Sequence, residues 1–177
     1  MESSQCLAAM AGELIECPAL VPHSLSSAGR ALSSLGDAYC AYSWLRLGLE
    51  AAIQYAYYVL QGVGWEEALQ RIARRSKGAA SFTATMIKML RGVHGSRRRW
   101  ILRVYLGLGE WLHPSISVHR VGGRIILDEE LVREVLDAIS YVCCLTGSCV
   151  SLDTARSCGL EKTRRLLLRH ASSGKEG

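Results

Sequence analysis

Apolar side chains recur at helical spacing along most of this chain. The longest such segment runs from Asp37 to Gln61, where apolar residues cover nearly the whole circumference of the expected helix. A helix that is apolar all round has to be buried on every side. Asp37 is a favourable N-cap and Gly62-Val63-Gly64 a favourable stop, so the pattern predicts one long helix at the centre of a bundle.

Amphipathic segments on either side predict the neighbours of this helix. Residues 96–113 place apolar side chains on one helical face, at Trp100, Ile101, Val104, Tyr105, Leu108, Trp111 and Leu112. Asp128 caps another predicted helix that ends near Gly147. Further predicted helices cover residues 1–16, 65–76, 79–93 and 153–170, and the Ser- and Ala-rich residues 23–36 form a helix start or a linker.

The period changes from helical to alternating between Ser117 and Leu127. Two short apolar runs flank Gly122-Gly123, which is typical of a hairpin turn. The predicted fold class is therefore all-α, an up-and-down helical bundle of about five main helices with one small β-hairpin near 117–127. Its parts are an N-terminal helix and linker (1–36), a core helical bundle (37–147), and a C-terminal basic helix and tail (148–177) packed on the core.

Composition fits one globular domain. The chain has 177 residues, of which 49% are hydrophobic, so a sizeable core is available and disorder throughout is excluded. It contains no Walker loop, GxGxxG, GxSxG or HExxH sequence. Those absences argue against nucleotide-binding α/β folds and the commoner hydrolases, and no cofactor is expected.

The charge is concentrated in the middle of the chain. Residues 63–124 carry twelve basic and three acidic side chains, a net +9, whereas the whole chain carries +5. Such a block suits a phosphate-bearing partner, and the alternative is a solvated helix face that pairs with the acidic helix after Asp128. Three arginines stand at a helix N-terminus, where the dipole disfavours cations, which favours a role in phosphate contact. The candidate nucleic-acid-binding residues are Arg97, Arg98, Arg99, Arg91 and Arg74.

A second stripe of the 96–113 helix carries candidate catalytic residues. Arg103, Glu110 and His113 fall on one helix edge, which aligns a cation, a carboxylate and an imidazole. An imidazole oriented by a carboxylate, with an arginine that holds a phosphate, is what RNA cleavage by internal transfer requires. The structural alternative is an Arg–Glu pair with His113 at the negative end of the helix dipole.

Two charges interrupt the long apolar helix. Arg46 and Glu50 lie four residues apart, and a buried charge needs a partner. We expect them to pair with each other or to reach Arg103 or His113 on a facing helix. Structural locking and the lining of an active site both fit this arrangement.

Seven cysteines match no paired metal template, so no metal site is predicted. Most are interpreted as small buried apolar residues of an intracellular protein. A disulfide stays open if the source is a hyperthermophile, to which the absence of Asn weakly points. A redox- or metal-responsive role for Cys143–Cys158 is a third, separate hypothesis.

Nothing in the sequence indicates a membrane or a targeting segment. The first sixteen residues contain three glutamates and no basic group, unlike a signal peptide. The run from Ala38 to Leu60 is long enough to span a bilayer, but Arg46 and Glu50 near its centre are costly in lipid. The expected location is cytoplasmic, without membrane association.

Two segments resemble divergent HEPN-type proteins, many of which are archaeal. They are WLRLGLEAAIQYAYYVLQG (Trp44–Gly62) and VYLGLGEWLHPS (Val104–Ser115), with Tyr105, Glu110 and His113-Pro114-Ser115 in a similar arrangement. The resemblance implies a four- or five-helix bundle over roughly residues 37–145, and a dimeric protein that is a metal-independent RNase or a toxin component. The family pattern places four to six residues between its Arg and His, whereas nine separate Arg103 from His113.

Two functions follow as hypotheses. The first is a HEPN-like protein that associates with RNA or an RNA-containing partner through a basic face, with His113 as a candidate ribonuclease residue. The second is a non-catalytic helical interaction or structural protein. A homodimer is expected in both cases, and a cognate antitoxin or another protein is a further candidate partner.

Overall fold

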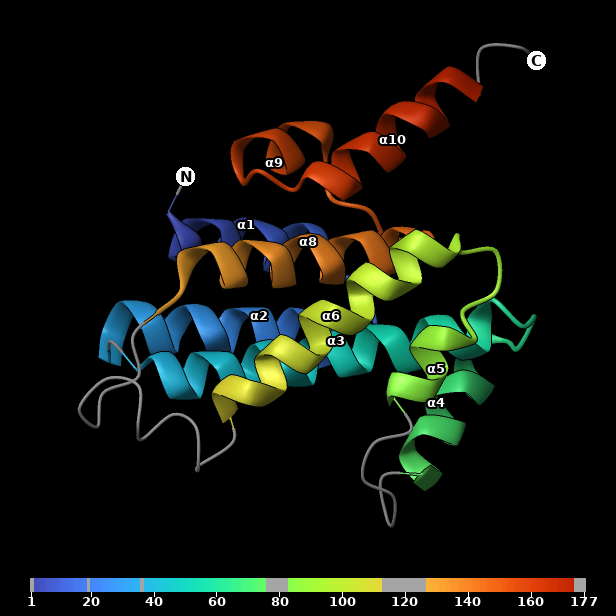
Figure 1. Cartoon of the computed structure of the whole chain (residues 1–177), viewed down its shortest axis with the longest axis horizontal. Coiled ribbons are helices and arrows are strands. Elements are labelled where there is room, and N and C mark those ends of the chain that lie inside the picture. Colours follow the sequence, from blue (N-terminus) through green and yellow to red (C-terminus); the bar gives the residue numbers. More distant parts are fainter. Residues whose placement is uncertain (1, 19, 36, 76–82, 113–126, 174–177) are drawn as a thin grey trace.

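The computed structural model describes residues 2–18, 20–35, 37–75, 83–112 and 127–173. Every regular element in these residues is a helix, which confirms the all-α prediction (Figure 1). The described part contains nine α-helices rather than about five. The predicted hairpin falls on residues 117–126, which lie outside the described residues, and Leu127 is not in a strand.

The long apolar helix α3 (Ala38–Val59) is the centre of the fold and contacts α2, α4, α5, α6 and α8. Tyr42, Leu45, Leu49 and Ile53 on it are completely buried. The Asp37 carboxylate accepts a hydrogen bond from the Cys40 amide at 2.9 Å, so the predicted N-cap is confirmed. The prediction of burial on every side is too strong: α3 is covered over most of its circumference, but Tyr39 and Leu47 are exposed.

The N-terminal residues belong to the same core. Helices α1 (Ser3–Glu13) and α2 (Leu20–Arg30) are followed by a π-helical turn η1 (Ala31–Leu35), and α2 packs along α3. Close approach depends on small residues, because a Cβ on Gly48 would lie 3.2 Å from the Ser24 Cβ. The segment 23–36, interpreted from sequence as a helix start or a linker, is thus mostly helix.

Helix α8 (Glu129–Cys144) lies beside α1 and crosses α6 (Gly95–Leu112) (Figure 1). The Asp128 carboxylate accepts hydrogen bonds from the Glu130 and Leu131 amides, which confirms the second predicted cap. The Asp128 amide donates to the Tyr42 hydroxyl at 2.7 Å, so α3 fixes the start of α8. At one end of the bundle lie α4 (Trp65–Arg75) and α5 (Thr83–Lys88).

Two sequence-based helix boundaries were wrong. The segment predicted to run to residue 93 ends at Lys88, because a turn with Gly92 at a φ of +71° follows. The basic helix predicted over 153–170 is two helices, α9 (Leu152–Ser157) and α10 (Glu161–Ser173). Gly159 separates them with a φ of +68°, a conformation that glycine adopts without strain. These two helices form a layer above α1 and α8 (Figure 1).

Candidate nucleic-acid interface

Helix α6 begins at Gly95, one residue before its predicted start, and His94 stands at the N-cap position. The His94 carbonyl accepts hydrogen bonds from the Arg97 and Arg98 amides at 2.9 and 3.1 Å. The His94 ring nitrogen Nδ1 lies 2.9 Å from the Ser96 Oγ and 3.3 Å from the Ser96 amide nitrogen. These contacts fix the start of α6, immediately before the three arginines Arg97, Arg98 and Arg99.

The three arginines at the start of α6 point in different directions. Arg98 donates through Nη1 to the Lys88 carbonyl at 2.5 Å and so turns toward α5. Arg99 is exposed, and Arg103 lies one turn further along the same edge with 71% of its side chain exposed. Arg97 is half-buried and lies toward α8, close enough to oppose the burial that raises the pKa of Tyr141.

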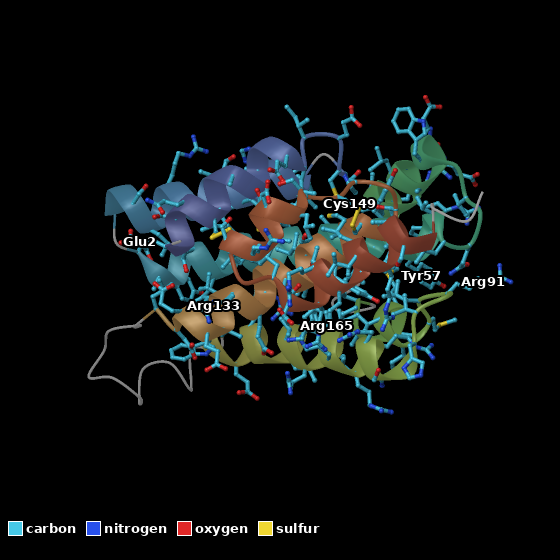
Figure 2. The ribbon with its side chains drawn as sticks, turned by 90° about the horizontal axis from the view of Figure 1, so that it is seen from above. Glu2, Tyr57, Arg91, Arg133, Cys149 and Arg165 are labelled. Atoms are coloured by element: carbon cyan, nitrogen blue, oxygen red, sulfur yellow. A yellow bond between two sulfur atoms is a disulfide. The ribbon has the colours of Figure 1, made fainter. Side chains whose placement is uncertain are left out.

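Helix α10 contributes a second row of cations. Lys162, Arg165 and Arg169 stand at positions i, i+3 and i+7, which share one helical stripe. The Lys162 Nζ lies 5.1 Å from the centre of the Trp100 ring, so this stripe is the one that faces α6. Figure 2 shows Arg165 near the middle of the molecule, over the region of α6 and α8.

Ion pairs join the two rows through α8. Arg103 Nη2 lies 3.0 Å from Glu134 Oε1, and Lys162 Nζ lies 3.9 Å from the same oxygen. Arg165 in turn pairs with Glu161 at 3.1 Å. We call this surface the basic face and define it by six cations: Arg97, Arg99, Arg103, Lys162, Arg165 and Arg169. Against the two carboxylates Glu134 and Glu161, six minus two leaves an excess of four positive charges.

Tyr141 marks the place where α6 and α10 converge. Burial raises the pKa of its hydroxyl, and both Arg97 from α6 and Arg169 from α10 act in the opposite direction. The Tyr141 ring packs edge-on against Trp100, with 5.9 Å between ring centres. Both aromatic rings are buried, so they support the basic face from below and do not present a stacking surface.

The other two arginines of the predicted set lie away from this face. Helix α4, which carries Arg74, extends away from the start of α6 on the far side of α5 (Figure 1). Arg91 lies at the end of the molecule formed by α4 and α5 (Figure 2). The sequence grouped these arginines by proximity along the chain, whereas the fold brings α10 to Arg97 and Arg99 instead.

The predicted Arg103–Glu110–His113 stripe is only partly described. Arg103 and Glu110 are both exposed on one edge of α6, as predicted, but Arg103 pairs with Glu134 of α8. His113 lies outside the described residues. Glu110 stands two helical turns beyond Arg103, so a carboxylate ends the row of cations there.

Arg46 and Glu50 form a polar cluster with Tyr105 of α6. Arg46 donates through Nε to Glu50 Oε1 at 3.1 Å and through Nη2 to the Tyr105 hydroxyl at 2.9 Å. The Tyr105 hydroxyl donates to the same Glu50 oxygen at 2.8 Å. A Cβ on Gly109 would lie 2.9 Å from Arg46 Nη1, so the glycine makes room for the guanidinium. Arg46 and Glu50 thus pair with each other, one of the two predicted alternatives, and Tyr105 of the facing helix joins them. Arg103 pairs with Glu134 instead, and His113 lies outside the described residues.

The cluster locks the register of α3 against α6. Burial raises the pKa of Tyr105, and the neighbouring Glu50 raises it further, so the hydroxyl stays protonated and can donate. Arg46 Nε and Nη2, the Tyr105 hydroxyl and Glu50 Oε1 all have partners within the cluster, which is what a half-buried ion pair needs. The arrangement is explained by packing without a ligand.

Glu50→Ala is expected to lower the free energy of unfolding by about 2 kcal/mol, because it leaves Arg46 and the Tyr105 hydroxyl half-buried without their acceptor. Urea denaturation followed by circular dichroism measures the loss. Glu67→Ala is the matched control, since Glu67 pairs with Arg71 across the same spacing on an exposed surface and should cost under about 0.5 kcal/mol. Equal losses in the two variants would contradict a locking role.

The cysteines hold the one long-range covalent link among the described residues. Cys6 is bonded to Cys158 and Cys144 to Cys149, while Cys17, Cys40 and Cys143 are thiols. The sequence left disulfides open, and its spacing rules gave no pairing. Within the described part of the chain no group of three or more His, Cys, Asp or Glu side chains is placed to hold a metal ion.

Comparison with known proteins adds no relative. No protein-family model, no curated protein and no solved structure matches this chain. In the ranges that the structure describes, no helix has both the length and the apolar character to cross a bilayer.

Proposed function

We propose that this protein associates with RNA, or with an RNA-containing partner, through the basic face. The observation that carries the proposal is the convergence of two rows of cations, one from α6 and one from α10, which outnumber the carboxylates Glu134 and Glu161 that pair with them. Lysine and arginine rows of this kind bind a phosphate backbone mainly by releasing its counterions. The choice of RNA over other polyanions follows the HEPN resemblance, which is itself part of the proposal.

Recognition would be by phosphate contact rather than by base reading. Single-strand platforms expose aromatic rings for the bases to stack on. The aromatic rings beneath the basic face, Trp100 and Tyr141, are both buried. We therefore expect weak dependence on base sequence and strong dependence on salt.

The proposal concerns binding and does not include cleavage. The guanidinium of Arg103, which the ribonuclease hypothesis assigns to a phosphate, is engaged by Glu134 rather than by Glu110. A catalytic role for His113, assembly as a homodimer and pairing with an antitoxin therefore stay predictions from the sequence.

Replacing three exposed arginines of the basic face, as Arg99→Gln, Arg165→Gln and Arg169→Gln together, is expected to weaken RNA binding by ten- to a hundredfold, roughly the effect of three lost phosphate contacts. The slope of log K against log salt should fall by about 2, since each contact to a single strand contributes about 0.7. Fluorescence anisotropy of a labelled RNA between about 50 and about 200 mM salt measures both quantities.

The matched control is Arg74→Gln, Arg91→Gln and Arg156→Gln together, which removes the same charge from positions away from the basic face. It should keep most of the affinity and the slope. Equal weakening by both variants would show that only overall charge matters, and unchanged binding by the first variant would refute the basic face as the site.

A further inference from the structure

We infer that the Cys6–Cys158 disulfide is a redox-sensitive latch that holds α10 in place on the basic face. The inference rests on the proposed function and adds a form of regulation to it. Its structural basis is that half of the six cations, namely Lys162, Arg165 and Arg169, stand on a helix that follows Cys158 directly.

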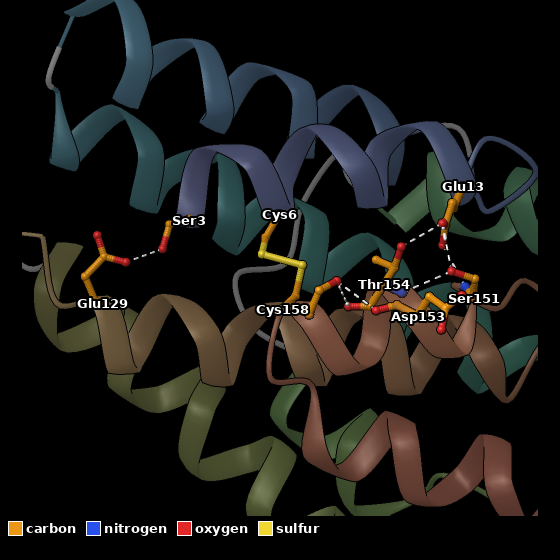
Figure 3. The surroundings of a disulfide bond; sticks show 9 residues. Ser3, Cys6, Glu13, Glu129, Ser151, Asp153, Thr154 and Cys158 are labelled. Atoms are coloured by element: carbon orange, nitrogen blue, oxygen red, sulfur yellow. Dashed lines mark hydrogen bonds between the residues drawn. A yellow bond between two sulfur atoms is a disulfide. The ribbon is translucent and has the colours of Figure 1, made fainter. Parts of the chain in front are cut away.

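The disulfide lies at the hinge between α9 and α10. Cys158 is the C-cap of α9, and only Gly159 and Leu160 separate it from the first residue of α10. The bond joins this hinge to α1, with 5.7 Å between the two Cα atoms (Figure 3). It therefore fixes the point from which α10 departs.

Glu13 supports the same junction from the other end of α9. Its carboxylate accepts hydrogen bonds from the Ser151 amide at 2.6 Å, the Ser151 hydroxyl at 3.0 Å and the Thr154 hydroxyl at 2.7 Å (Figure 3). Although burial acts against it, these hydrogen bonds hold the pKa of Glu13 below its ordinary value. Helix α9 is thus clamped to α1 by one covalent bond and one carboxylate.

Helix α10 itself is anchored mainly at its beginning. The Asp137 carboxylate of α8 accepts hydrogen bonds from the Lys162 and Thr163 amides, both at 2.9 Å. Residues 168–172 are exposed, and the C-terminal end of α10 extends away from the body (Figure 1). Because Arg165 and Arg169 lie beyond this first turn, their position depends on how firmly the start of α10 is held, by Asp137 and by the hinge at Cys158 together.

A dithiol reductant opens the latch in two steps. Its thiolate attacks one sulfur of the Cys6–Cys158 bond to form a mixed disulfide, and its second thiol then displaces the protein sulfur. The products are two cysteine thiols and the cyclic disulfide of the reductant, with two electrons and two protons transferred. Cys6 and Cys158 are buried, so reduction requires α9 to open transiently from α1 and should be slow.

With the latch open, α10 has to be ordered again when RNA binds, and that ordering weakens the complex. Reduction of the wild-type protein with dithiothreitol is expected to lower RNA affinity about tenfold and the salt slope by about 1 to 2, since α10 supplies three of the six cations. Anisotropy of a labelled RNA measures both. Amide hydrogen exchange of residues 161–173, which should accelerate, gives a readout that does not need RNA.

Two variants separate the disulfides. Cys144→Ala/Cys149→Ala retains only the latch and should respond to dithiothreitol as the wild type does. Cys6→Ala/Cys158→Ala should bind RNA as weakly as the reduced wild type does, both with and without dithiothreitol. If the effect of dithiothreitol on RNA affinity is lost in Cys144→Ala/Cys149→Ala and kept in Cys6→Ala/Cys158→Ala, the latch is overturned.

The remaining outcomes distinguish the latch from the proposed function. If oxidised wild type binds no RNA, the proposed function fails, and hydrogen exchange alone decides whether reduction loosens α10. If oxidised protein binds RNA and reduction changes neither affinity nor exchange in 161–173, the latch fails by itself. If reduction removes most of the helical circular dichroism signal, the bond stabilises the whole fold and is not a local latch.

Discussion

Asp137→Ala is expected to lower the free energy of unfolding by about 3 kcal/mol, one of the largest losses from a single polar side chain in this protein. Asp137 is only 2% exposed. Its Oδ2 accepts the Lys162 amide and its Oδ1 the Thr163 amide, and the Thr163 hydroxyl lies 2.8 Å from Oδ1. Alanine would leave these donors at the start of α10 without an acceptor, and Thr163 is completely buried.

Urea denaturation at neutral pH measures this loss. Asp153→Ala is the control, because the Asp153 side chain is 93% exposed and its pair with Arg156 is 3.8 Å long. It should change the free energy of unfolding by less than about 0.5 kcal/mol. If Asp137→Ala loses no more free energy of unfolding than Asp153→Ala does, Asp137 does not hold α10 to α8.

The pH dependence tests the same carboxylate. Burial raises the pKa of Asp137 above its ordinary value of 3.8, even though the amides of Lys162 and Thr163 favour its charged form. A raised native pKa means that the folded state binds the proton more tightly, so this contribution to stability is present below pH 3.8 and is lost as the pH rises through the native pKa. In Asp137→Asn the free energy of unfolding should not show this decrease with rising pH. Urea denaturation at several acidic pH values measures it.

Removal of the Cys6–Cys158 bond by Cys6→Ala/Cys158→Ala is expected to lower the free energy of unfolding by about 5 kcal/mol. The bond closes a loop across a sequence separation of 152, so it restricts nearly the whole unfolded chain. In the chain-entropy model the stabilisation grows with the logarithm of loop length. The second disulfide of the same protein is the comparison. Cys144–Cys149 spans a sequence separation of 5, and its removal should cost about 2 kcal/mol.

Guanidinium denaturation of the three proteins, each oxidised and then reduced, measures both differences. Reduction should bring the wild type down by the sum of the two effects, and each variant by only the effect of its remaining bond. Equal losses for the long and the short loop would contradict an origin in the unfolded chain and would place the stabilisation in native contacts around α1 and α9.

Features that depend on a few neighbouring residues could be predicted from the sequence. The caps at Asp37 and Asp128 and the central position of α3 are of this kind, since an N-cap bonds within three residues and a helix with so few polar residues needs other helices to cover most of it. The sequence also indicated that Arg46 and Glu50 need a partner on a facing helix, but not that Tyr105 supplies it. A charge's requirement for a partner is local, whereas the choice of partner depends on how two helices cross.

Contacts between distant segments were decided only by the tertiary structure. The capping of α10 by Asp137, 25 and 26 residues earlier, and the pairing of Cys6 with Cys158 have no local signal in the chain. The same holds for the basic face, because Arg103 and Lys162 share Glu134 only after α8 has brought α6 and α10 together. Helical periodicity fixes which side of each helix is buried, and the packing of those sides then decides which polar residues become neighbours.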